Sequence, residues 1–131
     1  MNRRKARENA FLVLFEAGFH RQGSAAGIYK SSTEEGRLEP DPFTEELVQG
    51  VNARLAEIDD VISRHLKQWK KERMSRVSLA VLRLSVYEIL YSEISDRIAA
   101  NEAVELCKKY DTEDGPAFVN GMLGSIIRGK A

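Results

Sequence analysis

The stretch RVSLAVLRLSVYEILYSEI, residues 76–94, is apolar on nearly every side when it is wound as a helix at 100° per residue. This pattern predicts a central helix that is surrounded by other helices. Glu88 falls on its apolar stripe, together with Val81 and Leu84. Because a buried carboxylate needs a partner, we predict that Glu88 is a structural residue, bound to an arginine or to a helix end, rather than a catalytic acid.

Apolar residues at helical spacing flank this segment on both sides. Towards the N-terminus they predict helices over residues 5–20, from Asp41-Pro42 onward and over residues 55–69. Towards the C-terminus they predict a helix over residues 99–110 and a last one that begins at Asp114-Gly115-Pro116. Residues 22–41 are small and polar, so we expect the longest loop there, with at most a short helical turn. The pattern predicts an all-α fold of six to seven helices.

Length and composition define the class of protein. The 131 residues fit one domain, and we expect a single domain over residues 1–131. The single cysteine, Cys107, lies on an apolar helix face, is expected in the core and suits a reducing cytoplasm. No apolar run approaches the roughly 20 residues of a membrane-spanning helix, so we expect no contact with a membrane.

Residues for catalysis or cofactor binding do not converge in the sequence. His20 and His65 are isolated, and no nucleophile has a partner base at a suggestive spacing. The segment GSIIRGKA, residues 124–131, resembles a phosphate-binding loop, but it ends in alanine and no strand is predicted before it. We therefore expect no enzymatic activity, no metal and no cofactor.

Charge is balanced over the whole chain and uneven along it. The formal net charge is zero, yet the first ten residues hold four cations and one acid. Residues 64–76 hold six cations and one acid, which we interpret as a solvated helix face. The partial positive charge at a helix N-terminus repels cations, so the first cluster does not serve the helix. A phosphate backbone would gain from both the cations and the free N–H groups, which predicts nucleic-acid binding.

Three blocks of the sequence stand out by their order and spacing. They are RRKAR at residues 3–7, VLRL at residues 81–84 with Tyr87-Glu88 after it, and ANEAVEL at residues 100–106 followed by FVNG at 118–121. Together they resemble the NusB family of bacterial transcription antitermination factors. The resemblance implies an all-α fold of two small packed helical bundles without catalytic activity. It also implies binding of boxA-type single-stranded RNA from ribosomal RNA leaders, pairing with the ribosomal protein NusE, and action with RNA polymerase.

The resemblance also implies site residues, carried over by position. The implied RNA-binding residues are Arg3, Arg4, Lys5, Arg7 and Arg83. The implied partner-binding residues are Asp114 and Phe118 at the start of the last helix, and Phe15 and Ser78 at positions near the NusE contact. Two of these depart from the family pattern, because many members carry an acid in place of Ser78 and some carry tyrosine in place of Phe15.

A rival interpretation is a helical protein–protein module, such as a homodimer, without an RNA function. Ala117, Gly121 and Gly124 make a small-residue side of the last predicted helix, which suits close packing of two helices. RNA binding that weakens steeply with salt would favour the first interpretation. A mass that depends on concentration, without RNA affinity, would favour the second.

Overall fold

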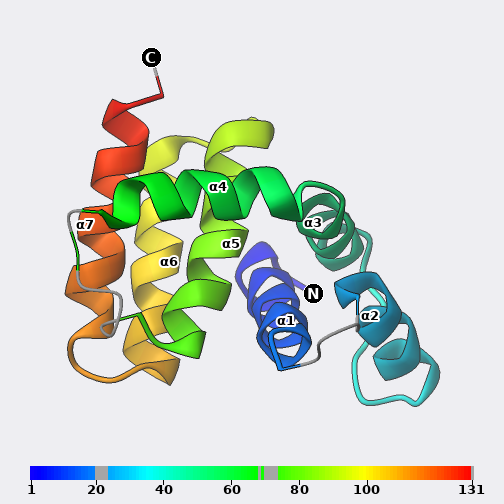
Figure 1. Cartoon of the computed structure of the whole chain (residues 1–131). Helices are drawn as coiled ribbons and strands as arrows, with labels where there is room; N and C mark the ends of the chain where they lie inside the picture. The colour runs from blue at the N-terminus through cyan, green and yellow to red at the C-terminus, as the bar shows by residue number, and fades with distance from the viewer. Residues whose placement is uncertain (20–23, 68, 70–73, 131) are drawn as a thin grey trace.

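The computed structural model describes residues 1–19, 24–67, 69 and 74–130, and over these residues it contains helices and no strand. In chain order the helices are α1 (Arg3–Ala17), α2 (Ala25–Glu34), α3 (Pro42–Ala53), α4 (Leu55–Leu66), α5 (Arg76–Tyr91), α6 (Asp96–Tyr110) and α7 (Gly115–Arg128) (Figure 1). The predicted all-α fold is confirmed.

The helices form two groups that share the central helix α5 (Figure 1). The first group contains α1, α2 and α3, which pack with one another. In the second group α4, α6 and α7 pack against α5. Because α1 and α3 also contact α5, the buried side chains of both groups form one hydrophobic cluster. These groups correspond to the two small bundles that the family resemblance implied.

The central helix α5 is buried as its sequence predicted. Leu82, Leu84 and Ile89 are at most 2% exposed. The helix begins at the cap Ser75, whose side chain accepts a hydrogen bond from a backbone N–H of the first turn. A Cβ atom at Gly50 of α3 would lie 2.2 Å from Cζ of Tyr87. Glycine at this position therefore lets α3 approach α5 closely.

Residues 25–34 form the helix α2, so the expectation of a long loop there was wrong. Ser24 caps this helix by accepting the N–H of Gly27 at 3.0 Å. Tyr29 is 7% exposed, and its hydroxyl group accepts the N–H of Asp41 at 3.1 Å. Small polar residues do not predict such a helix, because its stability comes from packing against α1 and α3 rather than from its own periodicity.

An ion pair between Arg7 and Glu88 anchors α1 to α5. Nε of Arg7 donates to Oε1 of Glu88 at 2.8 Å, and Nη2 donates to Oε2 at 3.0 Å. The two side chains are only 7% and 3% exposed. The predicted structural role of Glu88 is therefore confirmed, with an arginine as its partner.

A second polar contact anchors α1 to α6. The carboxylate of Glu8 accepts the hydroxyl of Tyr110 at 2.6 Å and also binds the ammonium group of Lys109. Lys5 lies 3.4 Å from the same carboxylate. The hydrogen bond from Lys109, followed by that from Tyr110, lowers the pKa of Glu8 to about 2. The contact therefore favours the ionised form of Glu8 in the folded protein.

We expect Arg7→Ala to lower the free energy of unfolding by about 3–5 kcal/mol, because Glu88 would be left charged and unpaired in the interior. Glu88→Ala should have an effect of similar size. The double variant Arg7→Met/Glu88→Leu should recover most of the loss, since apolar residues of similar volume often replace a buried pair without penalty. Urea denaturation followed by circular dichroism measures all three. Single variants as stable as the wild type would contradict the anchor.

The Glu8 contact should also make stability depend on pH. The pKa of Glu8 is lower in the folded chain than the value of about 4.3 in an unfolded chain. The stabilisation is therefore fully present above about pH 5 and is lost as the pH falls towards 2. We expect a loss on the order of 2 kcal/mol, because Lys109 is exposed and solvent screens part of the interaction. Between about pH 5 and pH 2, the melting temperature of Glu8→Gln should fall less steeply with decreasing pH than that of the wild type. An equally steep fall in the variant would exclude Glu8 as the source of the acid sensitivity.

Candidate nucleic-acid interface

Arg3, Arg4 and Lys5 form an exposed cationic group at the start of α1, called here the N-terminal cluster. Asn2 caps the helix, and its side chain accepts the N–H of Lys5 at 2.8 Å. Arg4 pairs with Glu102 of α6 at 2.7 Å, yet the arginine side chain stays 73% exposed. The cluster thus presents three cations to solvent at a helix end whose dipole and free N–H groups already favour an anion.

Arg7, another residue of the predicted RNA-binding set, is not part of this exposed cluster. The residue is 5% exposed, and its guanidinium group lies against Glu88 and 3.5 Å from Oε1 of Glu102. At Arg7 the helix is already packed between α3 and α5. The guanidinium group of Arg7 is thus engaged with two carboxylates and lies in the wall of the cavities beside the cluster, so contact between Arg7 and RNA stays a prediction.

Arg83 lies apart from the N-terminal cluster, on the side of α5 that faces α4. Its Nε and Nη2 each donate to a carboxylate oxygen of Asp59 at 2.9 Å. Five residues separate Arg83 from Glu88, which at 100° per residue turns them about 140° apart around α5. Arg83 and α1 therefore lie on different sides of α5, and contact between Arg83 and RNA stays a prediction.

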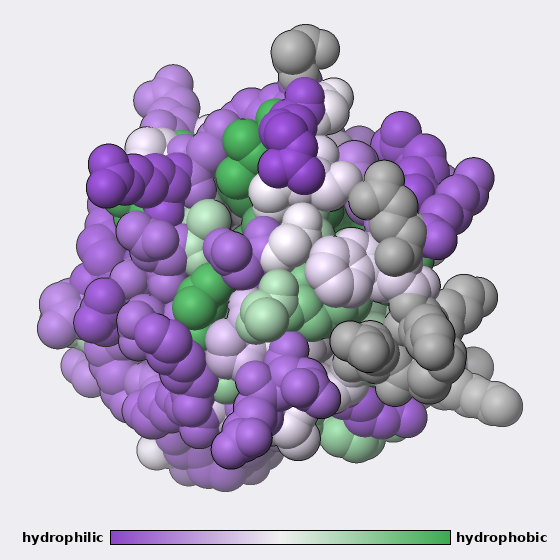
Figure 2. Space-filling view, turned by 90° about the vertical axis from the view of Figure 1, so that its left-hand side faces the viewer, coloured by the Kyte–Doolittle hydropathy of each residue, from purple (hydrophilic) through white to green (hydrophobic). Residues whose placement is uncertain are grey.

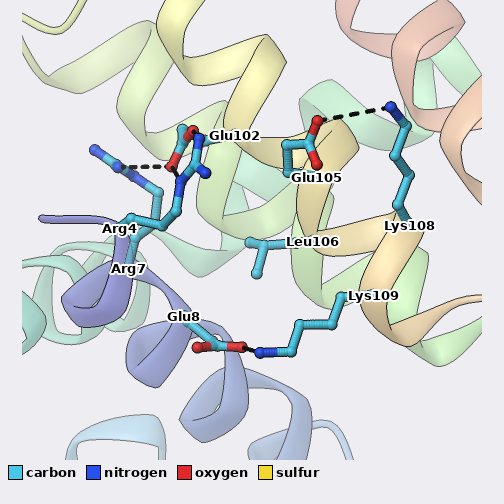
Figure 3. Close-up of a pocket in the computed structure, with 8 residues that line it drawn as sticks. All are labelled: Arg4, Arg7, Glu8, Glu102, Glu105, Leu106, Lys108 and Lys109. Atoms are coloured by element: carbon cyan, nitrogen blue, oxygen red, sulfur yellow. Dashed lines mark hydrogen bonds and ion pairs between the residues drawn. The ribbon is translucent and has the colours of Figure 1, made fainter.

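A cavity of about 320 Å³ lies between α1 and α6, beside the N-terminal cluster (Figure 3). Arg4 reaches Glu102 on one side of it, and Lys109 reaches Glu8 on the other (Figure 3). Lys108 and Lys109 are 61% and 62% exposed, so they extend the positive charge of the cluster onto α6. No sequence pattern pointed to these lysines, because the helix dipole favours cations in the last turn of any helix.

Ser78 and Phe118, two residues of the predicted partner-binding set, are buried. Ser78 is 0% exposed, and its hydroxyl donates to Oδ2 of Asp111 at 2.6 Å. Phe118 is 4% exposed, and its ring packs edge-to-face against Trp69 with the centroids 5.4 Å apart. Both residues hold helix ends together from the inside, and a part for either in partner binding stays a prediction.

Phe15 is half-buried and Asp114 is exposed. They belong to the end of α1 and the start of α7, which lie with the start of α5 on the same lower side of the molecule in Figure 1. Phe15 packs edge-to-face on Phe19, which is 55% exposed. The guanidinium group of Arg76 lies 4.5 Å from the centroid of the Phe19 ring. Asp114 follows the α6–α7 turn, which is hydrogen-bonded to the start of α5. We call this surface, with Phe15, Phe19, Arg76 and Asp114, the α1–α5–α7 end.

The small-residue side of α7 is covered at Gly121 by the chain itself. A Cβ atom at Gly121 would lie 2.6 Å from Cζ2 of Trp69. Only glycine leaves room for the Trp69 ring at this position. The small-residue side of α7, which suggested a helix dimer, is thus explained at Gly121 by packing within one chain. Figure 2 looks onto the side of the molecule where α7 lies and shows apolar side chains in patches between hydrophilic ones.

Other predicted features are structural or lie outside the described residues. Cys107 is fully buried, as predicted, and burial raises the pKa of its thiol to about 12. His65 shares a hydrogen bond of 2.8 Å with Ser125, whereas His20 and residues 68 and 70–73 of the second basic segment are not described.

Among the described residues no group of His, Cys, Asp and Glu is placed to hold a metal ion. None of the helices described here is long and apolar enough to cross a membrane.

Comparisons with known sequences agree with this geometry. The family model described as the NusB family matches residues 4–128. The transcription antitermination protein NusB of Clostridium novyi is 39% identical over 132 residues, which cover 98% of this chain and 99% of that protein. The protein of the same name from Bacillus pumilus is 43% identical over 127 residues, which cover 96% of this chain and 95% of that protein.

Solved structures show the same fold. NusB of T. maritima superposes with a TM-score of 0.86 at 34% identity, covering 100% of this chain and 94% of that chain. A chain from the crystal structure of the antitermination factors NusB and NusE in complex with double-stranded RNA superposes with a TM-score of 0.81 at 30% identity, covering 97% and 96%. Because the family match and these likenesses span almost the whole sequence, the chain belongs to the NusB family.

Proposed function

We propose that residues 1–131 act as one RNA-binding domain in transcription antitermination. The N-terminal cluster binds boxA-type single-stranded RNA, and the α1–α5–α7 end binds the ribosomal protein NusE. The pair then joins the antitermination complex of RNA polymerase in the cytoplasm, as an adaptor without a catalytic step or a cofactor. The observation that carries this proposal is the N-terminal cluster, in which three adjacent cations are exposed at a helix start.

The fold does not need these three cations, which supports a role in binding. Arg7 and Glu8 already anchor α1 to α5 and α6 through buried contacts. The pair between Arg4 and Glu102 is largely exposed on the arginine side, and such pairs contribute about 0–1 kcal/mol. A phosphate at this helix start would gain from the cations, the helix dipole and the free N–H groups together.

The α1–α5–α7 end supports binding of a protein partner. An exposed aromatic ring with an arginine beside it, as in Phe19 and Arg76, is the residue chemistry that dominates the energy of protein interfaces. A solved relative that matches 97% of this chain forms a complex with NusE and RNA. The two proposed sites lie at opposite ends of α1, whose 15 residues span about 22 Å. Contacts at both ends of one rigid helix would raise the effective concentration of each partner for the other.

Replacing the N-terminal cluster should separate binding from stability. In Arg3→Ala/Arg4→Ala/Lys5→Ala, we expect a melting temperature close to that of the wild type, because loss of exposed pairs is offset by relief of dipole repulsion. The affinity for single-stranded RNA should fall. The slope of log K against log salt should shrink by roughly 0.7 for each cation, or about 2 in total.

The matched control is Lys30→Ala/Arg37→Ala/Arg54→Ala, which removes the same charge from exposed positions on and after α2 and α3. This control should bind RNA with the salt slope of the wild type. Titrations with single-stranded and double-stranded RNA of the same sequence show which form the cluster prefers. A cluster variant that loses stability but keeps its RNA affinity and salt slope would refute the proposed RNA site and favour the helical protein–protein module.

Phe19→Ala should weaken binding of purified NusE on the order of tenfold or more, since a central aromatic side chain often contributes above 1.4 kcal/mol. Because Phe19 is exposed, the melting temperature and the RNA affinity of the isolated chain should hardly change. Phe118→Ala is the contrasting variant: its buried ring should cost about 3–5 kcal/mol of stability. Isothermal titration calorimetry measures the binding. Unchanged NusE affinity in Phe19→Ala would place the partner elsewhere.

A further inference from the structure

A second cavity, of about 470 Å³, opens beside the N-terminal cluster and is lined by α1, α3, α5 and the start of α6. Its lining includes the ring of Phe43, and the guanidinium group of Arg3 lies 4.0 Å from the centroid of that ring. Tyr87 and Ile98 add further flat and apolar surface. Ile98 is 51% exposed, so part of this apolar lining is open to solvent. The cavity thus offers stacking surface directly next to the cationic cluster.

The cavity is lined by charges of both signs, and the buried pair of Arg7 and Glu88 forms part of its wall. Arg3 also belongs to the N-terminal cluster, whereas Glu46 and Glu93 are exposed carboxylates of the same cavity. The carboxylates repel a phosphate group and accept hydrogen bonds from amino groups. A nucleotide at this place would therefore keep its phosphate near Arg3 and turn its base towards the carboxylates.

We propose that this cavity takes up one unpaired base of the bound RNA, stacked on the ring of Phe43. This inference rests on the proposed RNA binding, and it adds that the cavity binds the base of one nucleotide. Unpaired bases in protein–RNA complexes stack on aromatic rings and on guanidinium planes, and both are present here. Arg3 is exposed and covers the ring, so it can leave the ring for the adjacent phosphate when the base enters.

The lining also predicts which bases fit. Glu46 and Glu93 can only accept hydrogen bonds while they are ionised. A base with an exocyclic amino group, as in cytosine or adenine, supplies the donor that such acceptors need. Uracil has no amino group and would place a carbonyl oxygen near the carboxylates. The cavity should therefore prefer an amino-bearing base at one position of the RNA.

The test is a scan of a boxA-type single-stranded RNA in which each base in turn is removed to leave an abasic nucleotide. For the wild-type chain, fluorescence anisotropy should show one internal position where the loss weakens binding about 5- to 150-fold, the range for loss of one stacking contact. Phe43→Leu should weaken binding of the intact RNA by a similar factor, and the abasic change at that position should then have no further effect. The salt slope should stay at the wild-type value, since no phosphate contact is lost.

Matched variants separate stacking from packing. Leucine at position 43 keeps apolar contact with the core but has no ring, and Phe43→Tyr should bind like the wild type. Tyr91→Leu removes another aromatic ring beside an arginine, with the guanidinium group of Arg54 at 4.2 Å from its centroid, and should leave RNA affinity unchanged. Uracil at the sensitive position should weaken wild-type binding, and Glu46→Gln/Glu93→Gln should reduce that discrimination.

The outcomes distinguish this inference from the function on which it rests. Suppose that the wild type binds RNA in a salt-dependent manner. The base site would then be overturned, and the RNA-binding role kept, if folded Phe43→Leu binds RNA with full affinity. The same holds if removal of a base weakens binding by Phe43→Leu as much as binding by the wild type. Absence of salt-dependent RNA binding by the wild type would overturn both. If Phe43→Leu does not fold, 2-aminopurine at the sensitive position reports on the wild type, and fluorescence that is not quenched on binding would overturn the base site.

Discussion

The bidentate pair between Arg7 and Glu88 joins the first helix to the central one at a place that water does not reach. Because both charges are buried, α1 cannot slide or turn on α5 without breaking this pair, and Arg7 also lies 3.5 Å from Oε1 of Glu102 on α6. The position of α1 determines where the N-terminal cluster and Phe19 lie, because they are at its two ends. Both proposed surfaces therefore depend on this buried contact.

Acidic side chains set the limits of the cationic surface. Glu102 and Glu8 hold Arg4 and Lys109 across the cavity between α1 and α6, so these cations are already oriented when a phosphate arrives (Figure 3). Glu46 belongs to the acid-rich stretch of residues 34–60 and lines the neighbouring cavity. With a net charge of zero, the chain attracts a polyanion only where cations gather locally. The start of α1, where we propose that RNA binds, is one such local group of cations.

The sequence by itself determined six of the seven described helices and several of their starts, because these depend on neighbours along the chain. The spacing of apolar residues located α5, and Asp41-Pro42 marked the start of α3 with the expected cap. The apolar stripe also showed that Glu88 would be buried and would need a partner. The three blocks that resemble the NusB family were readable for the same reason, since a motif is a local pattern. The segment that became α2 lacked such a pattern.

Only the tertiary structure decided which of these side chains can meet a partner. Arg3 and Arg7 are four residues apart on the same face of α1, so helical periodicity cannot tell them apart; one is exposed, and the other is covered by α3 and α5. Ser78 and Phe118 match family positions but are buried, whereas Phe19 and Lys109 carried no signal and are exposed. The physical reason is that burial depends on what packs against a residue from distant parts of the chain. Spacing along one helix gives the direction of a side chain but not its neighbours.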